Sequence, residues 1–163
     1  EPNVVSYTAV IDGCAKAGDA EGAERWFETM LEHGITPNEL TYNALINACA
    51  RLGDYHGALR WLERMRSALH PDEVSYNSAI HACASARPAR LDEAERLFRE
   101  MMADGLQPTA STLSALKRAV GERRSTELCS TLGVDVGKAL RHRLNAEHRQ
   151  VRPLDPRGRG SGG

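Results

Sequence analysis

The sequence predicts an all-α fold, namely a right-handed α-solenoid superhelix of stacked antiparallel helix-turn-helix pairs. Three observations lead to this prediction. One segment recurs at steps of 34 to 37 residues, apolar residues within each copy have helical spacing, and glycines and prolines fall at regular breaks. Because a single helix pair cannot bury both of its faces, neighbouring pairs must stack into a solenoid with an extended concave surface.

The repeat is marked by four prolines at steps of 35, 34 and 37 residues: Pro2, Pro37, Pro71 and Pro108. Within residues 1–109, three near-copies are expected at approximately residues 3–37, 38–71 and 72–108. The third copy is longer because of an insertion around Pro88, and such variation belongs in a loop between helices. A match in register over three copies indicates a repeat architecture.

Two helices are predicted in each copy, because apolar residues recur at i, i+3, i+4 and i+7. In the first helices, the expected core residues are Tyr7, Val10, Ile11 and Cys14, then Tyr42, Leu45, Ile46 and Cys49, then Tyr76, Ala79, Ile80 and Cys83. In the second helices, they are Ala23, Trp26, Phe27 and Met30, then Ala58, Trp61, Leu62 and Met65, then Ala94, Leu97, Phe98 and Met101.

The helix breaks agree with this periodicity. Gly18 and Gly53 are each followed by an Asp, which predicts a helix stop and then the N-cap of the next helix. Gly34 and Gly105 are expected to end second helices, and each precedes a boundary proline.

The repeat decays after Pro108. Residues 110–134 are expected to form a degenerate or capping repeat, with Ser125 to Leu132 as its second helix. A basic helix is expected over residues 135–150, and residues 151–163 are expected to be a disordered tail. The basic residues of this part could contact phosphate, although a solvated helix face is the favoured interpretation: Arg141, His142, Arg143, His148, Arg149 and Arg152.

The composition and motifs of the chain argue against several classes of function. The chain has 163 residues and no apolar run long enough to span a membrane. Its four cysteines lie far apart, unlike the close pairs of a zinc site, and no catalytic motif is present. We therefore expect no enzyme activity, metal or cofactor. Residues 1–109 hold 10 Lys/Arg against 17 Asp/Glu, a charge of −7, which disfavours long-range attraction of a polyanion.

The repeat resembles the pentatricopeptide repeat (PPR) family, and the tetratricopeptide order of Trp, Leu-Gly and Tyr is absent. The resemblance lies in Val-Ser-Tyr-Thr (5–8), Leu-Thr-Tyr-Asn (40–43), Val-Ser-Tyr-Asn (74–77) and the closing Gly-Ile-Thr-Pro-Asn (34–38). It implies a single-stranded RNA-binding module that reads one base per repeat, with a mitochondrial or chloroplast location. It also allows other RNA-processing proteins as partners, in RNA processing, stability, editing or translation.

The resemblance also assigns roles to individual residues. The implied base-reading residues are Thr8, Asn43 and Asn77, each one position after the core Tyr, together with Asn38, Asp72 and Thr109 after the boundary prolines. Val5, Leu40 and Val74 match the apolar position that wedges between bases, and Lys16 and Arg51 match the phosphate-contacting position. The family's pairing rule then implies 5′-A-U-pyrimidine-3′.

Two alternatives stay open at this point. Asn38 and Asp72 have the residue types and positions of ordinary helix N-caps, and a surface Thr or Asn is commonly just solvated. The whole solenoid could instead be a protein-interaction scaffold that holds a peptide or helix in its groove. The sequence does not identify a target transcript, an oligomeric state or a neighbouring catalytic domain, and its first residues suggest an excised piece with further repeats ahead of Glu1.

Overall fold

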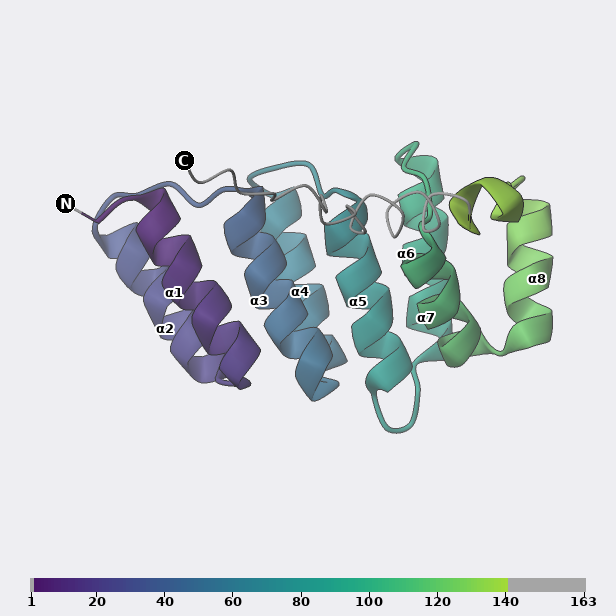
Figure 1. Ribbon diagram of the computed structural model, residues 1–163, viewed down its shortest axis with the longest axis horizontal. Coiled ribbons are helices and arrows are strands. Elements are labelled where there is room, and N and C mark those ends of the chain that lie inside the picture. The colour runs from purple at the N-terminus through teal and green to yellow at the C-terminus, as the bar shows by residue number, and fades with distance from the viewer. Residues whose placement is uncertain (1, 141–163) are drawn as a thin grey trace, which may run out of the picture.

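A computed structural model describes residues 2–140 as a row of helices (Figure 1). The helices are α1 (Val4–Ala17), α2 (Ala20–Glu32), α3 (Glu39–Leu52), α4 (Tyr55–Arg66), α5 (Glu73–Ser85), α6 (Leu91–Ala103), α7 (Ala110–Val120) and α8 (Glu122–Thr131). Each odd-numbered helix is antiparallel to the even-numbered helix that follows it, which makes four pairs within the described residues.

The ends of the helices follow the expected capping residues. Gly18 and Gly53 adopt left-handed conformations, with φ of 79° and 70°, and end α1 and α3. Asp19 and Asp54 then cap α2 and α4 by accepting hydrogen bonds from backbone N–H groups three residues later. A side chain at Gly53 would also place its Cβ 3.0 Å from the carbonyl oxygen of Ser85, so glycine suits this turn for two reasons.

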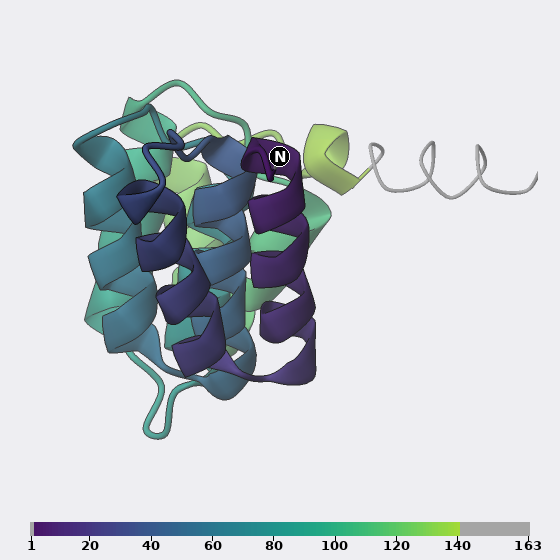
Figure 2. The same ribbon diagram turned by 90° about the vertical axis from the view of Figure 1, so that its left-hand side faces the viewer.

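The pairs stack into two layers. Helices α1, α3, α5 and α7 pack side by side in succession and form one layer, which we call the inner face. Helices α2, α4 and α6 lie on the other side, each against the first helix of the next pair, and the backbones of successive second helices are farther apart than those of successive first helices (Figure 2). Close packing on one side and wider spacing on the other curves the stack, so the all-α solenoid prediction is confirmed.

The core runs between the pairs. Its largest buried side chains include Tyr42, Trp61, Tyr76 and Phe98. The Phe27 ring lies edge-on to Tyr42 and Trp61 of the next pair, with ring centroids 5.4 and 4.9 Å away. These two aromatic contacts therefore join the first pair to the second.

Three residues of the expected core are not fully buried. Val10 and Trp26 keep 40% and 42% of their surface exposed, and Cys14 is half-buried. The equivalent residues of the second pair, Leu45 and Trp61, are covered by α1 and α2. Val10 and Trp26 are exposed because no pair within residues 2–140 lies on that side of the first pair.

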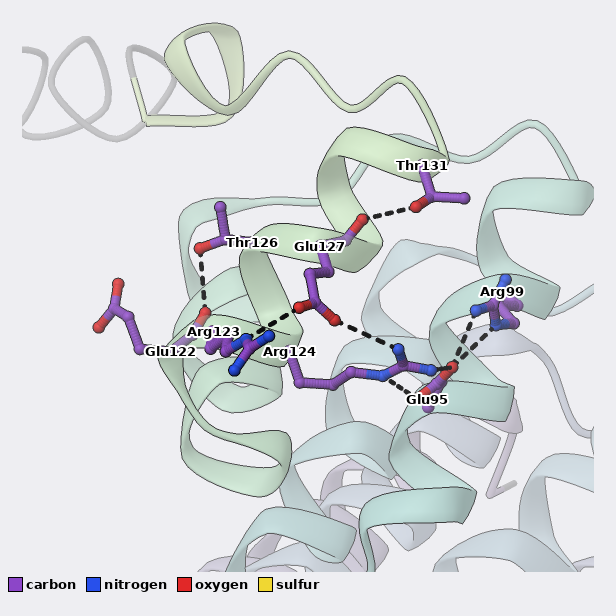
Figure 3. Close-up of polar contacts among 8 residues, drawn as sticks. All are labelled: Glu95, Arg99, Glu122, Arg123, Arg124, Thr126, Glu127 and Thr131. Atoms are coloured by element: carbon purple, nitrogen blue, oxygen red, sulfur yellow. Dashed lines mark hydrogen bonds and ion pairs between the residues drawn. The ribbon is translucent and has the colours of Figure 1, made fainter.

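Ion pairs join the second helices across the outer face. Arg64 lies 2.8 Å from Glu28 of the preceding pair, and Arg60 pairs in the same way with Glu24. At the other end of the solenoid, Glu95 of α6 binds Arg124 of α8 at 2.6 Å, in a network that also holds Arg99 and Glu127 (Figure 3).

This arrangement shows where many acidic residues of segment 1–109 lie. The acidic residues of the second helices lie on the layer opposite the inner face, and several are neutralised by arginines of a neighbouring pair. The negative total for residues 1–109 is therefore a poor guide to the charge along the inner face.

The last described part of the chain covers the end of the stack. Helix α8 is two residues longer than expected, and it packs on α7, whose Leu113 and Leu116 are buried. Residues 136–140 begin a further helix, and Ala139 is buried against the core. The remainder of the expected basic helix (residues 141–150), the six basic residues named above as possible phosphate contacts and the expected tail at 151–163 lie outside the described residues. No helix within residues 2–140 is long and apolar enough to cross a lipid bilayer.

Candidate functional site

A groove on the inner face brings together most of the residues implied as base readers and wedges. Its volume is about 570 Å³, and it runs across α1, α3 and the start of α5. The residues of interest that line it are Val5, Thr8, Asn38, Leu40, Asn43 and Val74. Six positions spread over 70 residues of sequence are thus gathered by the stacking of three first helices.

The three aliphatic residues are exposed at this groove. Val5, Leu40 and Val74 keep 70%, 67% and 54% of their surface accessible. Each is the second residue of a first helix and precedes the apolar residues of that helix that enter the core. Exposed aliphatic residues at matched positions of successive repeats indicate a surface for an apolar partner group.

The residues after the boundary prolines are helix N-caps, as the alternative interpretation holds. Asn38, Asp72 and Thr109 each accept a hydrogen bond from the N–H of the residue three positions later, at 3.1, 2.9 and 3.2 Å. The hydroxyl of that later residue in turn accepts from the cap's own N–H, which completes a capping box. Capping leaves other atoms of these side chains available, so it does not preclude a second role.

At the junction of the second and third pairs, three side chains form one cluster. The Asn43 amide nitrogen donates to both carboxylate oxygens of Asp72 at 3.2 Å. The Ser75 hydroxyl lies 2.8 Å from the Asn43 amide oxygen and 2.7 Å from Asp72 Oδ1. The Asn43–Asp72 contact joins the two residues that the family resemblance assigns to one base.

The electrostatics of Asp72 follow from this cluster. Burial alone would raise the pKa of its carboxyl group, but hydrogen bonds from the Ser75 hydroxyl and N–H, the Asn43 amide and the Val74 N–H outweigh that effect and lower the pKa. Asp72 is thus a carboxylate at neutral pH and acts only as an acceptor.

The junction of the first and second pairs has the same layout with different groups. The Thr8 and Thr41 hydroxyls lie 2.7 Å apart, and the Thr41 hydroxyl donates to Asn38 Oδ1 at 2.9 Å. Thr8 and Asn38 do not bond directly here, because Thr41 stands between them.

The third junction lacks such a cluster. Asn77 makes a long contact of 3.4 Å from its amide nitrogen to the Ser111 hydroxyl, and its buried amide oxygen has no partner among the described residues. Thr109 bonds to Thr112 at 3.0 Å and makes no hydrogen bond with Asn77 within the described part of the chain. The structure therefore joins the implied reading pair at the second junction, links it through a hydroxyl at the first and leaves it separate at the third.

Sequence reasoning missed the hydroxyl residues at these junctions. Thr41 and Ser75 are completely buried, and each contacts the implied reader of the preceding pair. The signal that could have found them is the capping box itself, Asn or Asp followed three residues later by Thr or Ser. Nothing local indicates that the same hydroxyl also reaches the preceding unit.

The two implied phosphate-contacting residues lie at the far ends of α1 and α3. Lys16 is exposed and pairs with Asp12 at 2.5 Å. Arg51 is exposed and donates to the backbone carbonyl of Lys16 at 3.3 Å. The two residues thus lie next to each other at one edge of the inner face.

A further row of residues runs along the inner face, each five residues after Tyr7, Tyr42, Tyr76 or Leu113. From α1 to α7 its members are Asp12, Asn47, His81 and Arg118. The first two line the groove described above, and the last two line a second cavity of about 500 Å³ between α5 and α7. Burial, and then the nearby Arg118 guanidinium, lower the pKa of His81. The inner face thus becomes more basic towards α7.

No group of His, Cys, Asp and Glu side chains among residues 2–140 is arranged to hold a metal ion. Burial, assisted by the Asp54 carboxylate at Cys49 and by Glu93 at Cys83, raises the pKa of both thiols to about 11. These are the environments of core cysteines and not of reactive thiolates.

Known proteins resemble this chain in both sequence and structure. A 124-residue stretch is 30% identical to a chloroplastic pentatricopeptide repeat-containing protein of Arabidopsis thaliana and covers 76% of this chain but 16% of that protein. The crystal structure of the pentatricopeptide repeat protein PPR10 in complex with an 18-nt psaJ RNA element matches with a TM-score of 0.70 and 26% identity, over 83% of this chain and 21% of that one.

A third comparison concerns the fold alone. The PPR domain of Arabidopsis thaliana protein-only RNase P 1, solved in complex with tRNA, matches with a TM-score of 0.66 and 16% identity, over 94% of this chain and 75% of that one. The chain thus spans about a sixth of the Arabidopsis chloroplastic relative and about a fifth of PPR10.

Family models cover the repeats directly. A model described as PPR repeat family matches residues 2–51 and 40–85, and one described as PPR repeat matches residues 74–106. Since the matched residues make up more than half of the sequence, this chain belongs to the pentatricopeptide repeat family.

Proposed function

We propose that this chain is a non-enzymatic module that binds single-stranded RNA sequence-selectively, with one base opposite each helix pair. Its reading residues are Thr8 with Asn38, Asn43 with Asp72, and Asn77 with Thr109. The protein that contains it acts in RNA processing, stability, editing or translation in a mitochondrion or chloroplast, alone or with other RNA-processing proteins.

The observation that carries this proposal is the alternation of apolar and polar groups along one groove. Exposed Val5, Leu40 and Val74 alternate with the polar side chains of Thr8 and Asn43. A nucleobase has two apolar faces and a polar edge, so an unstacked base fits between two aliphatic side chains with its edge towards the polar group. A peptide has no comparable alternation at the spacing of helix pairs.

The comparisons support an RNA ligand and an organellar setting. PPR10, which is 26% identical over most of this chain, has been solved in complex with an 18-nt RNA element. The Arabidopsis relative is named as chloroplastic. Charge is compatible with this function, because acidic residues of the second helices are paired on the outer face while Lys16, Arg51 and Arg118 lie along the inner one.

The test is an NMR titration of the isotopically labelled chain with short single-stranded RNAs, which detects weak binding to a small footprint. We expect shifts confined to α1, α3, α5 and α7, and affinity that falls steeply with salt because phosphate contacts release counterions. Leu40→Ser should weaken binding. Leu91→Ser is the matched control, since Leu91 is also an exposed leucine but begins the second helix α6.

Two results would count against the proposal. Shifts spread over both layers would indicate non-specific binding, and equal losses for Leu40→Ser and Leu91→Ser would remove the groove as the site. Binding of a peptide or helix at the groove without any response to RNA would favour the scaffold hypothesis instead.

A further inference from the structure

Buried hydroxyls contact the reading residues at the first two junctions. Thr41 and Ser75 have no exposed surface, so neither can touch a base. Each nevertheless contacts the reading residue of the preceding pair, at 2.7 and 2.8 Å. Their influence on a ligand must therefore pass through Thr8 and Asn43.

At the first junction, the hydrogen-bond directions follow from one known donor. Thr41 gives its single hydroxyl hydrogen to Asn38 Oδ1 at 2.9 Å. It must then accept the hydrogen of Thr8, whose hydroxyl lies 2.7 Å away. With its hydrogen used, Thr8 presents only oxygen lone pairs to the groove and is an acceptor.

At the second junction, the direction is reversed. The Asp72 carboxylate only accepts, so the Asn43 NH₂ group faces it and the amide oxygen faces the Ser75 hydroxyl. The single hydroxyl hydrogen of Ser75 is shared between the Asn43 oxygen and Asp72 Oδ1, at 2.8 and 2.7 Å. One amide hydrogen of Asn43 is engaged with the carboxylate. The second amide N–H of Asn43 remains to donate a hydrogen bond to a ligand in the groove.

The third junction provides an internal contrast. The Thr112 hydroxyl bonds to Thr109 but not to Asn77, so no buried hydroxyl fixes the Asn77 amide among the described residues. This amide can turn either its oxygen or its NH₂ group towards a ligand.

We propose that Thr41 and Ser75 are positioning residues that set the hydrogen-bond polarity of the preceding reader and thereby choose between amino and carbonyl groups on the base edge. This inference rests on the proposed function. Thr8, an acceptor, selects a base with an edge amino group, as in adenine or cytosine. Asn43, a donor, selects an edge carbonyl, as in uracil or guanine, and Asn77 makes neither choice.

The experiment compares Ser75→Ala with Ser75→Thr and Thr112→Ala. Ser75→Ala removes the hydroxyl, whereas Ser75→Thr keeps it, and Thr41 and Thr112 show that threonine occupies this place in neighbouring units. Thr112→Ala is the matched control, because it removes the same capping-box hydroxyl at a junction where that hydroxyl does not reach the reader. Each variant is titrated with four short RNAs that differ only at the base opposite Asn43.

We expect Ser75→Ala to reduce the preference for uracil over cytosine by about three- to tenfold, as for the loss of one hydrogen bond. Ser75→Thr should retain that preference, and Thr112→Ala should leave it unchanged. In the RNA-free protein, Ser75→Ala should also accelerate exchange of the Asn43 side-chain amide hydrogens with water.

The outcomes separate the two proposals. If the wild-type chain binds RNA but Ser75→Ala ranks uracil and cytosine as before, the polarity inference is overturned and the proposed function stands. If the wild-type chain binds no RNA, the proposed function fails together with its base selection, and the amide exchange still reports whether Ser75 positions Asn43. Equal effects of Ser75→Ala and Thr112→Ala would reduce the role of the hydroxyl to helix capping.

Discussion

The indole N–H of Trp61 donates a hydrogen bond of 3.1 Å to Glu24, a residue of the preceding helix pair. The same indole lies edge-on to Phe27, with ring centroids 4.9 Å apart, and carries the Arg64 guanidinium over its face at 5.1 Å. One side chain thus combines apolar burial, a charged acceptor and a cation at the boundary between the first two pairs.

Replacing Trp61 with alanine should lower the free energy of unfolding by about 3–5 kcal/mol, because Trp61 is 3% exposed and its loss leaves a cavity. Trp26→Ala is the matched control, since Trp26 holds the equivalent place in the first pair but is 42% exposed. Its loss should cost about 1 kcal/mol or less. Urea denaturation followed by circular dichroism measures both, and similar costs would contradict the packing described for the second pair.

Asn43→Thr should move the base preference at its position from uracil towards guanine, by about 1–3 kcal/mol if the contact resembles a good bidentate pair. The shorter threonine leaves more room between Leu40 and Val74 for a purine. The same four RNAs used for Ser75 measure the change. Identical ranking of the four bases by both proteins would remove Asn43 from the set of readers.

Acid should destabilise the protein partly through Asp72. Its folded-state pKa lies below the ordinary value, so its ionised form contributes stability that is complete above about pH 4 and is lost as the pH falls through the folded pKa. Asp72→Asn keeps a capping oxygen without the titration. The stability difference between the two proteins should therefore shrink from neutral pH to about pH 2.5 in urea denaturation, and a constant difference would refute the role of this carboxylate.

The cysteines should differ in their rates of alkylation. Cys49 and Cys83 are buried, and burial raises their pKa to about 11, so little thiolate forms in the folded protein near pH 8. Cys14 is half-buried and should react first. Mass spectrometry after a timed iodoacetamide treatment, with urea-unfolded protein as the reference, measures the order. Labelling of Cys49 as fast as Cys14 would show that α3 opens readily.

Much of the fold can be predicted from the sequence because each unit repeats the same apolar spacing and the same helix-capping residues. The stripe around Tyr42 and Ile46 and the Gly53-Asp54 break are sufficient to define a helix pair. The exposure of Val10 and Trp26 could not be predicted in this way. Their spacing is that of Leu45 and Trp61, and only the presence or absence of a covering pair decides burial.

The candidate site was less accessible to sequence reasoning. The family resemblance implies that Asn43 and Asp72 belong together, and the structure brings them within hydrogen-bond distance. The same resemblance implies an equivalent association for Asn77 and Thr109, where no hydrogen bond forms within residues 2–140. Thr109 has a shorter side chain than Asp72, so an equal register in the sequence does not give an equal contact.

Charge changes along the inner face in the row from Asp12 through Asn47 and His81 to Arg118. At the α1 end the acidic member is already neutralised by Lys16, whereas no carboxylate of the described chain forms an ion pair with Arg118 at the α7 end. If the proposed RNA ligand lies along this row, we expect it to be held more tightly near α7 than near α1. Its release should begin as fraying at the α1 end, so that the lifetime of a complex depends mostly on the last contacts to break, those beside Arg118.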